Sequence, residues 1–460
     1  MRKARRYLIP LYLMLGACMP VSQTDTATRA ATTAESTLPA MKSFAVPHPQ
    51  PPHGSNSDIA RDFLDLSFSL ESGRGLQTLT RFEGPIRVRV TGEPPATLQA
   101  DLARLLHRLR TEAGIDIALA GSGPSNVTIQ AVTRAEIRDQ LPTAACFVVP
   151  NVSSLKEYAA ARRSPRVSWS KLKSRERLAI FVPNDSSPQE ARDCLHEELA
   201  QALGPLNDLY RLPDSVFNDD NVHTVLTGFD MLILRAYYDP SLKTGMSRGE
   251  VADRLPGILA RINPAGIGGT PQRVTKTPRV WIDAVQTALG PGASPAERRA
   301  AATEALKVAS AMGWTDHRRA FSHYAMGRLL QSIDPEAAQD QFVLAQRYFG
   351  NSEETRLHRA YVASQLAAYA ISAGRPEDAL YLITPHLATA ERHENAALLA
   401  TLMMLRAEAL EMAGQVTEGR QVRLDSLGWA RYGFGSDWAV RAKLREIGSL
   451  SPLRRSRSAL

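Results

Sequence analysis

The chain has 460 residues, of which 44% are hydrophobic and 22% are charged. This composition indicates a globular protein with more than one core, and it excludes a collagen-like or wholly disordered chain. The formal net charge is +8, but most of the excess lies at the two ends, in Arg2, Lys3, Arg5, Arg6, Arg454, Arg455 and Arg457. Because the rest of the chain is close to neutral, the sequence predicts no nucleic-acid partner.

The N-terminus is typical of an export signal. Basic residues precede the apolar run 7–17, which is shorter than the roughly 20 residues that a membrane-spanning helix needs. The run ends in Leu15-Gly16-Ala17-Cys18, which resembles the bacterial lipobox. The resemblance implies that residues 1–17 are a lipoprotein signal peptide and that Cys18 is lipidated. An ordinary signal with an incidental Cys is the alternative.

The residues after Cys18 predict where the protein goes and how it is held there. The residue after Cys18 is Met19, whereas lipoproteins that are retained at the inner membrane have Asp at this position. We therefore expect a lipoprotein of the Gram-negative outer membrane that faces the periplasm. Residues 18–57 are rich in Ser, Thr, Ala and Pro and show no helical or strand period, which predicts a disordered tether between the membrane and the folded body.

The segment 58–265 predicts an α+β domain. Apolar residues recur at helical spacing in some stretches, and in others they alternate with polar residues or form short β-branched runs. The spacing predicts helices at 59–70 and 96–113, and strands at 85–91, 115–120, 127–132, 146–149 and 178–182.

Two cysteines remain in the exported chain, Cys146 and Cys194. An even pair in an oxidising compartment indicates a disulfide. Two buried free thiols are the alternative.

The most informative motif lies on a helix predicted from Pro188 to Gly204, which opens with Ser187, Pro188 and Glu190 in the positions that helix capping favours. Its end, with the residues that follow, resembles the metzincin proteases, in which two His on one helix face and a third His after a Gly hold zinc, and a Glu is the general base.

Aligned on Gly204, this chain has Glu197, Gln201 and Asn207 at the three ligand positions, and Glu198 at the general-base position. The register that begins at His196 would put Ala200, which cannot bind metal, at the second ligand position, so the first register is preferred.

Residues beyond the helix extend the resemblance. Phe217 stands where metzincins have the Met of a Ser-Val-Met turn, and a Leu-Thr-x-x-Asp segment follows at 226–230. Over residues 56–265 this variant motif is similar to a proteobacterial lipoprotein family of unknown function. That resemblance implies a metzincin-like fold but no activity.

Three interpretations of the altered site remain open: an active zinc hydrolase, a site for a harder divalent ion that amide oxygens suit, or a metal-free site. No other cofactor is predicted. His196 is also a candidate for a catalytic pair with Asp208 or His223, although a lone helical His is more often a packing residue.

The C-terminal half predicts helices alone. A Gly/Pro-rich linker at 266–280 precedes it, and the segment 281–450 is rich in Ala, Leu, Arg and Glu. Arg375-Pro-Glu resembles Asp334-Pro-Glu at an offset of 41 residues, and Gly374 and Gly414 lie 40 apart. Such a period resembles tetratricopeptide-type repeats, which bind a protein or peptide partner. A plain helical bundle is the alternative. Residues 451–460 predict a basic, disordered tail.

Two functions are therefore compatible with the sequence. The first is a lipid-anchored envelope protein with a catalytically silent metzincin-like domain and a helical domain that binds a partner. The second is an envelope metallohydrolase, a peptidase, with Glu198 as general base and an atypical metal at Glu197, Gln201 and Asn207.

Overall fold

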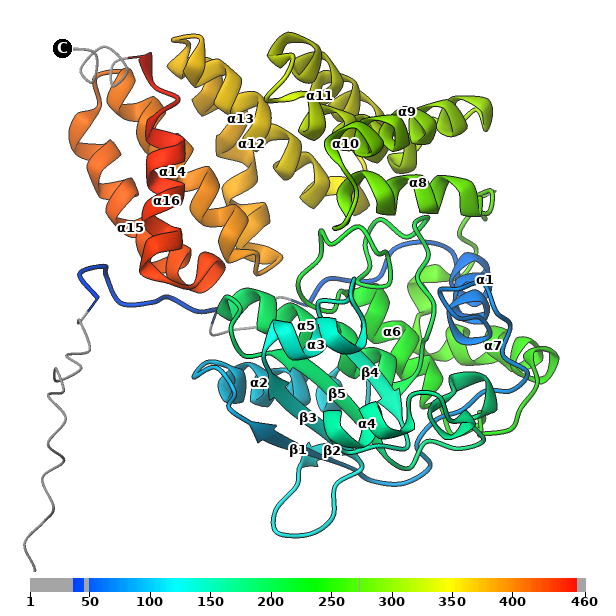
Figure 1. The fold of residues 1–460 in the computed structure, drawn as a ribbon. Helices are drawn as coiled ribbons and strands as arrows, with labels where there is room; N and C mark the ends of the chain where they lie inside the picture. The colour runs from blue at the N-terminus through cyan, green and yellow to red at the C-terminus, as the bar shows by residue number, and fades with distance from the viewer. Residues whose placement is uncertain (1–35, 45–48, 273, 453–460) are drawn as a thin grey trace, which may run out of the picture. The chain divides into compact units, whose positions relative to one another are not determined.

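A computed structural model describes residues 36–44, 49–272 and 274–452 of the chain. The predicted signal peptide, the lipidation site Cys18 and tail residues 453–460 lie outside the described residues. From Leu38 on, the chain forms one compact unit, with an α/β region first and an all-helical region after it (Figure 1).

A five-stranded sheet organises the α/β region. Its order is β2-β1-β3-β5-β4, and every neighbouring pair is parallel except β4 with β5. A mostly parallel sheet makes this region α/β, whereas the sequence predicted α+β. The bounds are β1 Ile86–Gly92, β2 Ile117–Leu119, β3 Val127–Val132, β4 Phe147–Pro150 and β5 Leu178–Pro183.

Strand β5 shows why the sheet is covered on both faces. Leu178 and Ile180 belong to the largest hydrophobic core, whereas Ala179 and Phe181 belong to a smaller core on the opposite face. All six residues of the strand are buried. A parallel sheet that is buried on both faces has apolar strands without alternation, which explains the run Leu-Ala-Ile-Phe-Val in the sequence.

Seven α-helices accompany the sheet among the described residues, and several start at the capping signals that the sequence carries. They are α1 Asn56–Ser67, α2 Leu98–Thr111, α3 Arg134–Gln140, α4 Leu155–Ala161, α5 Pro188–Leu203, α6 Gly228–Tyr237 and α7 Arg248–Ile262. Helices α2 and α5 pack in the largest core with the sheet. The predicted disulfide is confirmed: Cys146, next to the edge strand β4, is bonded to Cys194 in the middle of α5.

The rest of the described chain is helical. Consecutive helices pack on one another, in the order α8 Arg279–Leu289, α9 Pro295–Ala311, α10 His317–Leu330, α11 Pro335–Phe349, α12 Arg356–Ser372, α13 Pro376–Arg392, α14 Ala396–Met412, α15 Val416–Phe434 and α16 Asp437–Gly448. None of the described helices combines the length and the apolar character that a membrane span requires.

The end of the predicted tether packs on the helical region. The backbone N–H of Lys42 donates to the carbonyl of Gly428 at 3.0 Å. The ring of Phe44, only 5% exposed, stacks on Trp429 of α15 with ring centroids 4.5 Å apart. Residues 38–44 are therefore part of the folded body. The expectation of free chain up to residue 57 is wrong for this segment, because the ring of Phe44 packs on Trp429 of α15.

Candidate functional site

Helix α5 begins and ends where the sequence predicts. Ser187 caps its start by accepting a hydrogen bond from the N–H of Glu190 at 3.2 Å, with Pro188 in the first turn. At its end, the buried guanidinium of Arg175 donates to the carbonyls of Gln201 and Gly204 at 2.6 and 2.5 Å. Arg175 therefore satisfies carbonyl groups that a helix C-terminus leaves without partners.

Gly204 has a packing role. A Cβ at this position would lie 2.9 Å from Cδ2 of Tyr237, so only Gly allows α6 to approach the end of α5. Its φ of −162° is extended, and other residues adopt this conformation. The ring of Tyr237 therefore explains why this position is a Gly.

The three ligand-equivalent residues lie near the end of α5 but do not form a zinc site. Glu197 is half-buried and Gln201 is buried. The side-chain amide of Asn207 donates to the backbone carbonyl of Asp65 at 3.0 Å, so it bonds to the chain just inside the end of α1.

Buried acids surround the end of α5. Burial, with the charges of Asp219 and Glu71, raises the pKa of Glu197 to about 8. Burial and the charge of Glu197 raise the pKa of Glu198 well above its usual range. Burial raises the pKa of Asp208 in the same way. Burial and the neighbouring negative charges thus favour the protonated form of these three carboxyl groups.

This donor set does not fit zinc. Neutral amides are weak zinc ligands, and the amide of Asn207 is already bonded to Asp65. Among the described residues, the acids around α5 do not form a group of three that could hold a metal ion. The one group that could lies elsewhere in the structure.

The segment after α5 that resembles the metzincin turn is held by α6. Asp230, which is fully buried, accepts hydrogen bonds from Ser215 Oγ at 2.5 Å and from the N–H of Val216 at 3.1 Å. It also caps α6 together with Thr227. Phe217 is fully buried in the main core. The Ser-Val-Phe and Leu-Thr-x-x-Asp motifs thus have a structural explanation: they lock the turn to the next helix.

His196 is a buried hydrogen-bond acceptor. Its Nδ1 accepts from the backbone N–H of Leu226 at 3.1 Å, and burial with the nearby charge of Arg192 lowers its pKa well below the usual value. The Nε2 of His223 lies 3.0 Å from the carbonyl of Pro213. Both imidazoles therefore hydrogen-bond to the backbone, which agrees with a packing role for His196.

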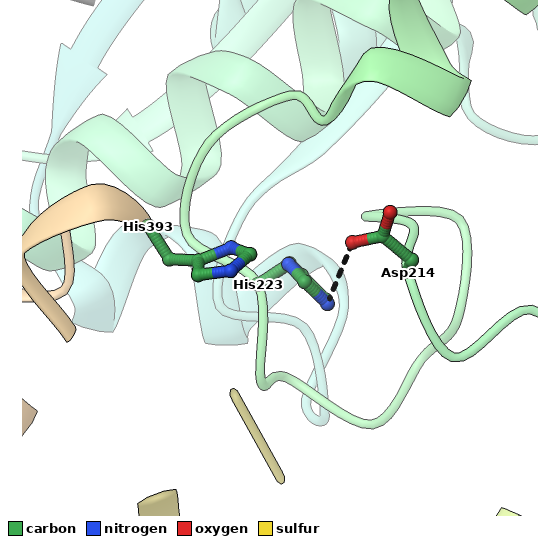
Figure 2. A group of neighbouring side chains, drawn as sticks. All are labelled: Asp214, His223 and His393. Carbon is green, nitrogen blue, oxygen red and sulfur yellow. Dashed lines mark ion pairs between the residues drawn. The ribbon is translucent and has the colours of Figure 1, made fainter. Parts of the chain in front are cut away.

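A different cluster brings metal-binding side chains together. Asp214, His223 and His393 each offer a ligand atom, and these atoms lie within 4.8 Å of one another. Figure 2 shows the ring of His223 between the ring of His393 and the carboxylate of Asp214. It is the one such group of three in the part of the chain that the structure describes. The sequence had pointed to His223 as a partner for His196, but nothing in it pointed to Asp214 or His393 as ligands.

A second feature is a cavity in the helical region. Its volume is about 470 Å³, within the range of small-molecule and peptide sites. It is lined by residues of α8 to α12 and by the loop residues Asp220, Asn221 and Val222. This loop also carries His223, so the cavity and the Asp/His cluster are neighbours along the chain.

Residues 56–257 match the model of a family described as a protein of unknown function, DUF2927. A domain of unknown function therefore covers most of the α/β region. No curated protein and no solved structure matches the chain.

Proposed function

We propose that this chain is a binding protein of the bacterial cell envelope: its metzincin-like α/β region is catalytically silent, and its helical region binds a protein or peptide that carries a carboxylate. The observation that carries the proposal is the cavity of about 470 Å³ beside α8 to α12. The resemblance of this region to tetratricopeptide repeats, which bind peptides, supports the same function.

The wall of the cavity is suited to a peptide side chain or terminus. Its aromatic lining comprises Phe321, Tyr324, Phe349 and Tyr361. Aromatic side chains bury large apolar areas at a small cost in conformational entropy, which is why they dominate binding sites.

The charge of the cavity selects the ligand. Arg298 and Arg328 both line it. Arg298 donates to the backbone carbonyl of Gly290 at 2.7 Å, and Arg328 donates to the hydroxyl of Tyr324 at 3.3 Å. The one carboxylate in the lining, Asp220, is 2.8 Å from Nε2 of His358. The two guanidinium groups thus add positive charge where a ligand carboxylate would find bidentate donors.

The binding proposal is tested with peptides of identical sequence that end in a free carboxylate or in an amide, measured by calorimetry. We expect binding of the free acids. In Arg328→Gln the affinity should fall about tenfold or more, because a charged hydrogen bond is worth roughly 1.5–3 kcal/mol. Arg347→Gln, on the exposed side of α11, is the matched control and should bind as the wild type does. Equal binding of acid and amide peptides would contradict the proposal.

The anchor is part of the same proposal. The lipobox resemblance at Cys18 supports a lipoprotein of the outer membrane that faces the periplasm. In cells that process lipoproteins, Cys18→Ser should move the protein from the membrane fraction to the soluble periplasmic fraction. A Cys18→Ser protein that stays with the membrane would show that the lipid does not hold it.

The metallohydrolase is the second candidate, and one observation favours it. Glu198 is only 5% exposed, and its Oε2 has no hydrogen-bond partner among the described residues. A buried, unpartnered carboxyl oxygen is costly, and a hard divalent ion at Glu197 and Glu198 would relieve that cost. We rank it second because amide groups are weak zinc ligands and the amide of Asn207 is already bonded to Asp65. The zinc contents of the wild type, Glu197→Gln and His223→Ala separate the two functions.

A further inference from the structure

The Asp214, His223 and His393 cluster joins the two regions of the molecule. Asp214 and His223 lie in the segment between α5 and α6, and His393 is the first residue after α13. The side chain of His223 is only 2% exposed and that of Asp214 is 12% exposed. Nε2 of His223 is 3.7 Å from Oδ1 of Asp214, and the rings of His223 and His393 have centroids 5.4 Å apart.

Two imidazoles and one carboxylate are donors typical of zinc and similar divalent ions. Three protein ligands leave a fourth position for water or another donor.

The segments that carry the ligands are fixed by contacts of their own. Thr227 Oγ1 donates to the carbonyl of Asp214 at 2.9 Å. On the other side, the guanidinium of Arg192, fully buried on α5, donates to the carbonyl of Glu394 at 2.6 Å. Gln189 accepts from the N–H of Ala397 at 2.9 Å. The cluster is thus held by the α/β region and by the α13–α14 turn independently of the ligand side chains.

The turn after His393 contains a residue other than Gly in a left-handed backbone conformation. Glu394 has a φ of +51°, a left-handed conformation that is unfavourable for a residue other than Gly. The corresponding residues after α12 and α14 are Gly374 and Gly414, with φ of +73° and +85°. A Glu is tolerated where its neighbours have Gly because its carboxylate and carbonyl both meet Arg192.

We propose that Asp214, His223 and His393 bind one Zn²⁺ ion, which fastens the turn between α13 and α14 to the loop after α5. The site does not depend on the binding function proposed above. Its purpose is to hold the helical region against the α/β region beside the cavity, whose lining includes Val222. In an exported protein a metal bond and the Cys146–Cys194 disulfide would act together, the disulfide within the α/β region and the metal between regions.

Nearby positive charge works against the metal. Arg356 and Arg392 both help to lower the pKa of His393, so they would repel a cation. Arg356 is paired with Glu353, which offsets one of the two charges. On the same argument, replacing Arg392 by Gln should strengthen Zn²⁺ binding.

The test uses the full chain without its signal peptide, stripped of metal with a chelator and titrated with Zn²⁺ by calorimetry. We expect one Zn²⁺ per chain and a rise in Tm on its addition, since a ligand that binds only the folded state stabilises it. His223→Ala and His393→Ala should each weaken the affinity for Zn²⁺ at least about 100-fold, because removing a ligand costs more affinity than removing a residue that only supports a ligand. His386→Ala, on the same helix α13, should bind as the wild type does.

Circular dichroism shows whether each variant folds. If a His→Ala variant fails to fold, His393→Gln, which keeps the size and polarity of the side chain, replaces it. A folded wild type whose Tm does not respond to Zn²⁺ would overturn the proposal. So would folded His223→Ala and His393→Ala proteins that respond as strongly as the wild type.

Discussion

At the scale of residues, the acids at the end of α5 define the character of the motif. Besides burial, the charge of Glu197 raises the pKa of Glu198, and the charges of Glu71, Glu197 and Glu198 raise that of Asp208. In a metal enzyme, ligands of these types would be held ionised by the cation. Here the amide of Asn207 bonds to α1 and the carbonyl of Gln201 bonds to Arg175, so the motif joins the end of α5 to its surroundings.

The pKa of Glu197 predicts a pH-dependent stability. Its usual value is 4.5, and in the folded state it is about 8. Between these pH values the folded state keeps a proton that the unfolded state has released, so this residue lowers the free energy of unfolding as the pH rises. Glu197→Gln removes the effect. The variant should gain stability relative to the wild type from pH 5 to pH 8, by about 1 kcal/mol or more.

Urea unfolding at the two pH values measures this difference. Glu377→Gln, on the exposed first turn of α13, is the control for the substitution itself. The difference between Glu197→Gln and the wild type should be smaller at pH 5 than at pH 8, because pH 5 lies just above the usual pKa of 4.5 and little of the linkage free energy has accumulated there. A difference that is the same at pH 5 and pH 8 would show that Glu197 does not hold its proton on folding.

At the scale of elements, the sequence was most informative where local signals agree. The Ser187 cap, Pro188 and the apolar spacing predicted α5 to within one residue of its observed end at Leu203. Strand β3 was predicted with its observed bounds Val127–Val132, because β-branched residues fill it. The parallel order of the sheet was not predictable, since it depends on which strands pair and not on their own residues.

The candidate site shows the same division. The motif helix, its Gly and the turn that follows were visible because they lie within one stretch of about 35 residues. The Asp/His cluster was not, because it depends on contacts such as that of Thr224 Oγ1 with the carbonyl of Glu394, 170 residues further along the chain. A His that follows a helix carries no local signal of a partner at that distance.

At the scale of the whole molecule, the α/β and helical regions are joined through α5. Gln189 and Arg192, near its N-terminal end, bond to Glu394, Asn395 and Ala397 of the helical region. The other end of α5 holds the buried acids. One helix thus connects the two regions at its start and carries the motif at its end, so the residues of the motif support the helix that contacts the helical region.

The central claim is that the motif on α5 is silent, and the zinc content of three purified proteins tests it most directly. Wild type, Glu197→Gln and His223→Ala are loaded with Zn²⁺, freed of excess metal and analysed by mass spectrometry. We expect the same content in the wild type and Glu197→Gln, and loss of zinc in His223→Ala. Loss of zinc in Glu197→Gln with retention in His223→Ala would contradict the account, because it would place the metal on α5 and favour the metallohydrolase.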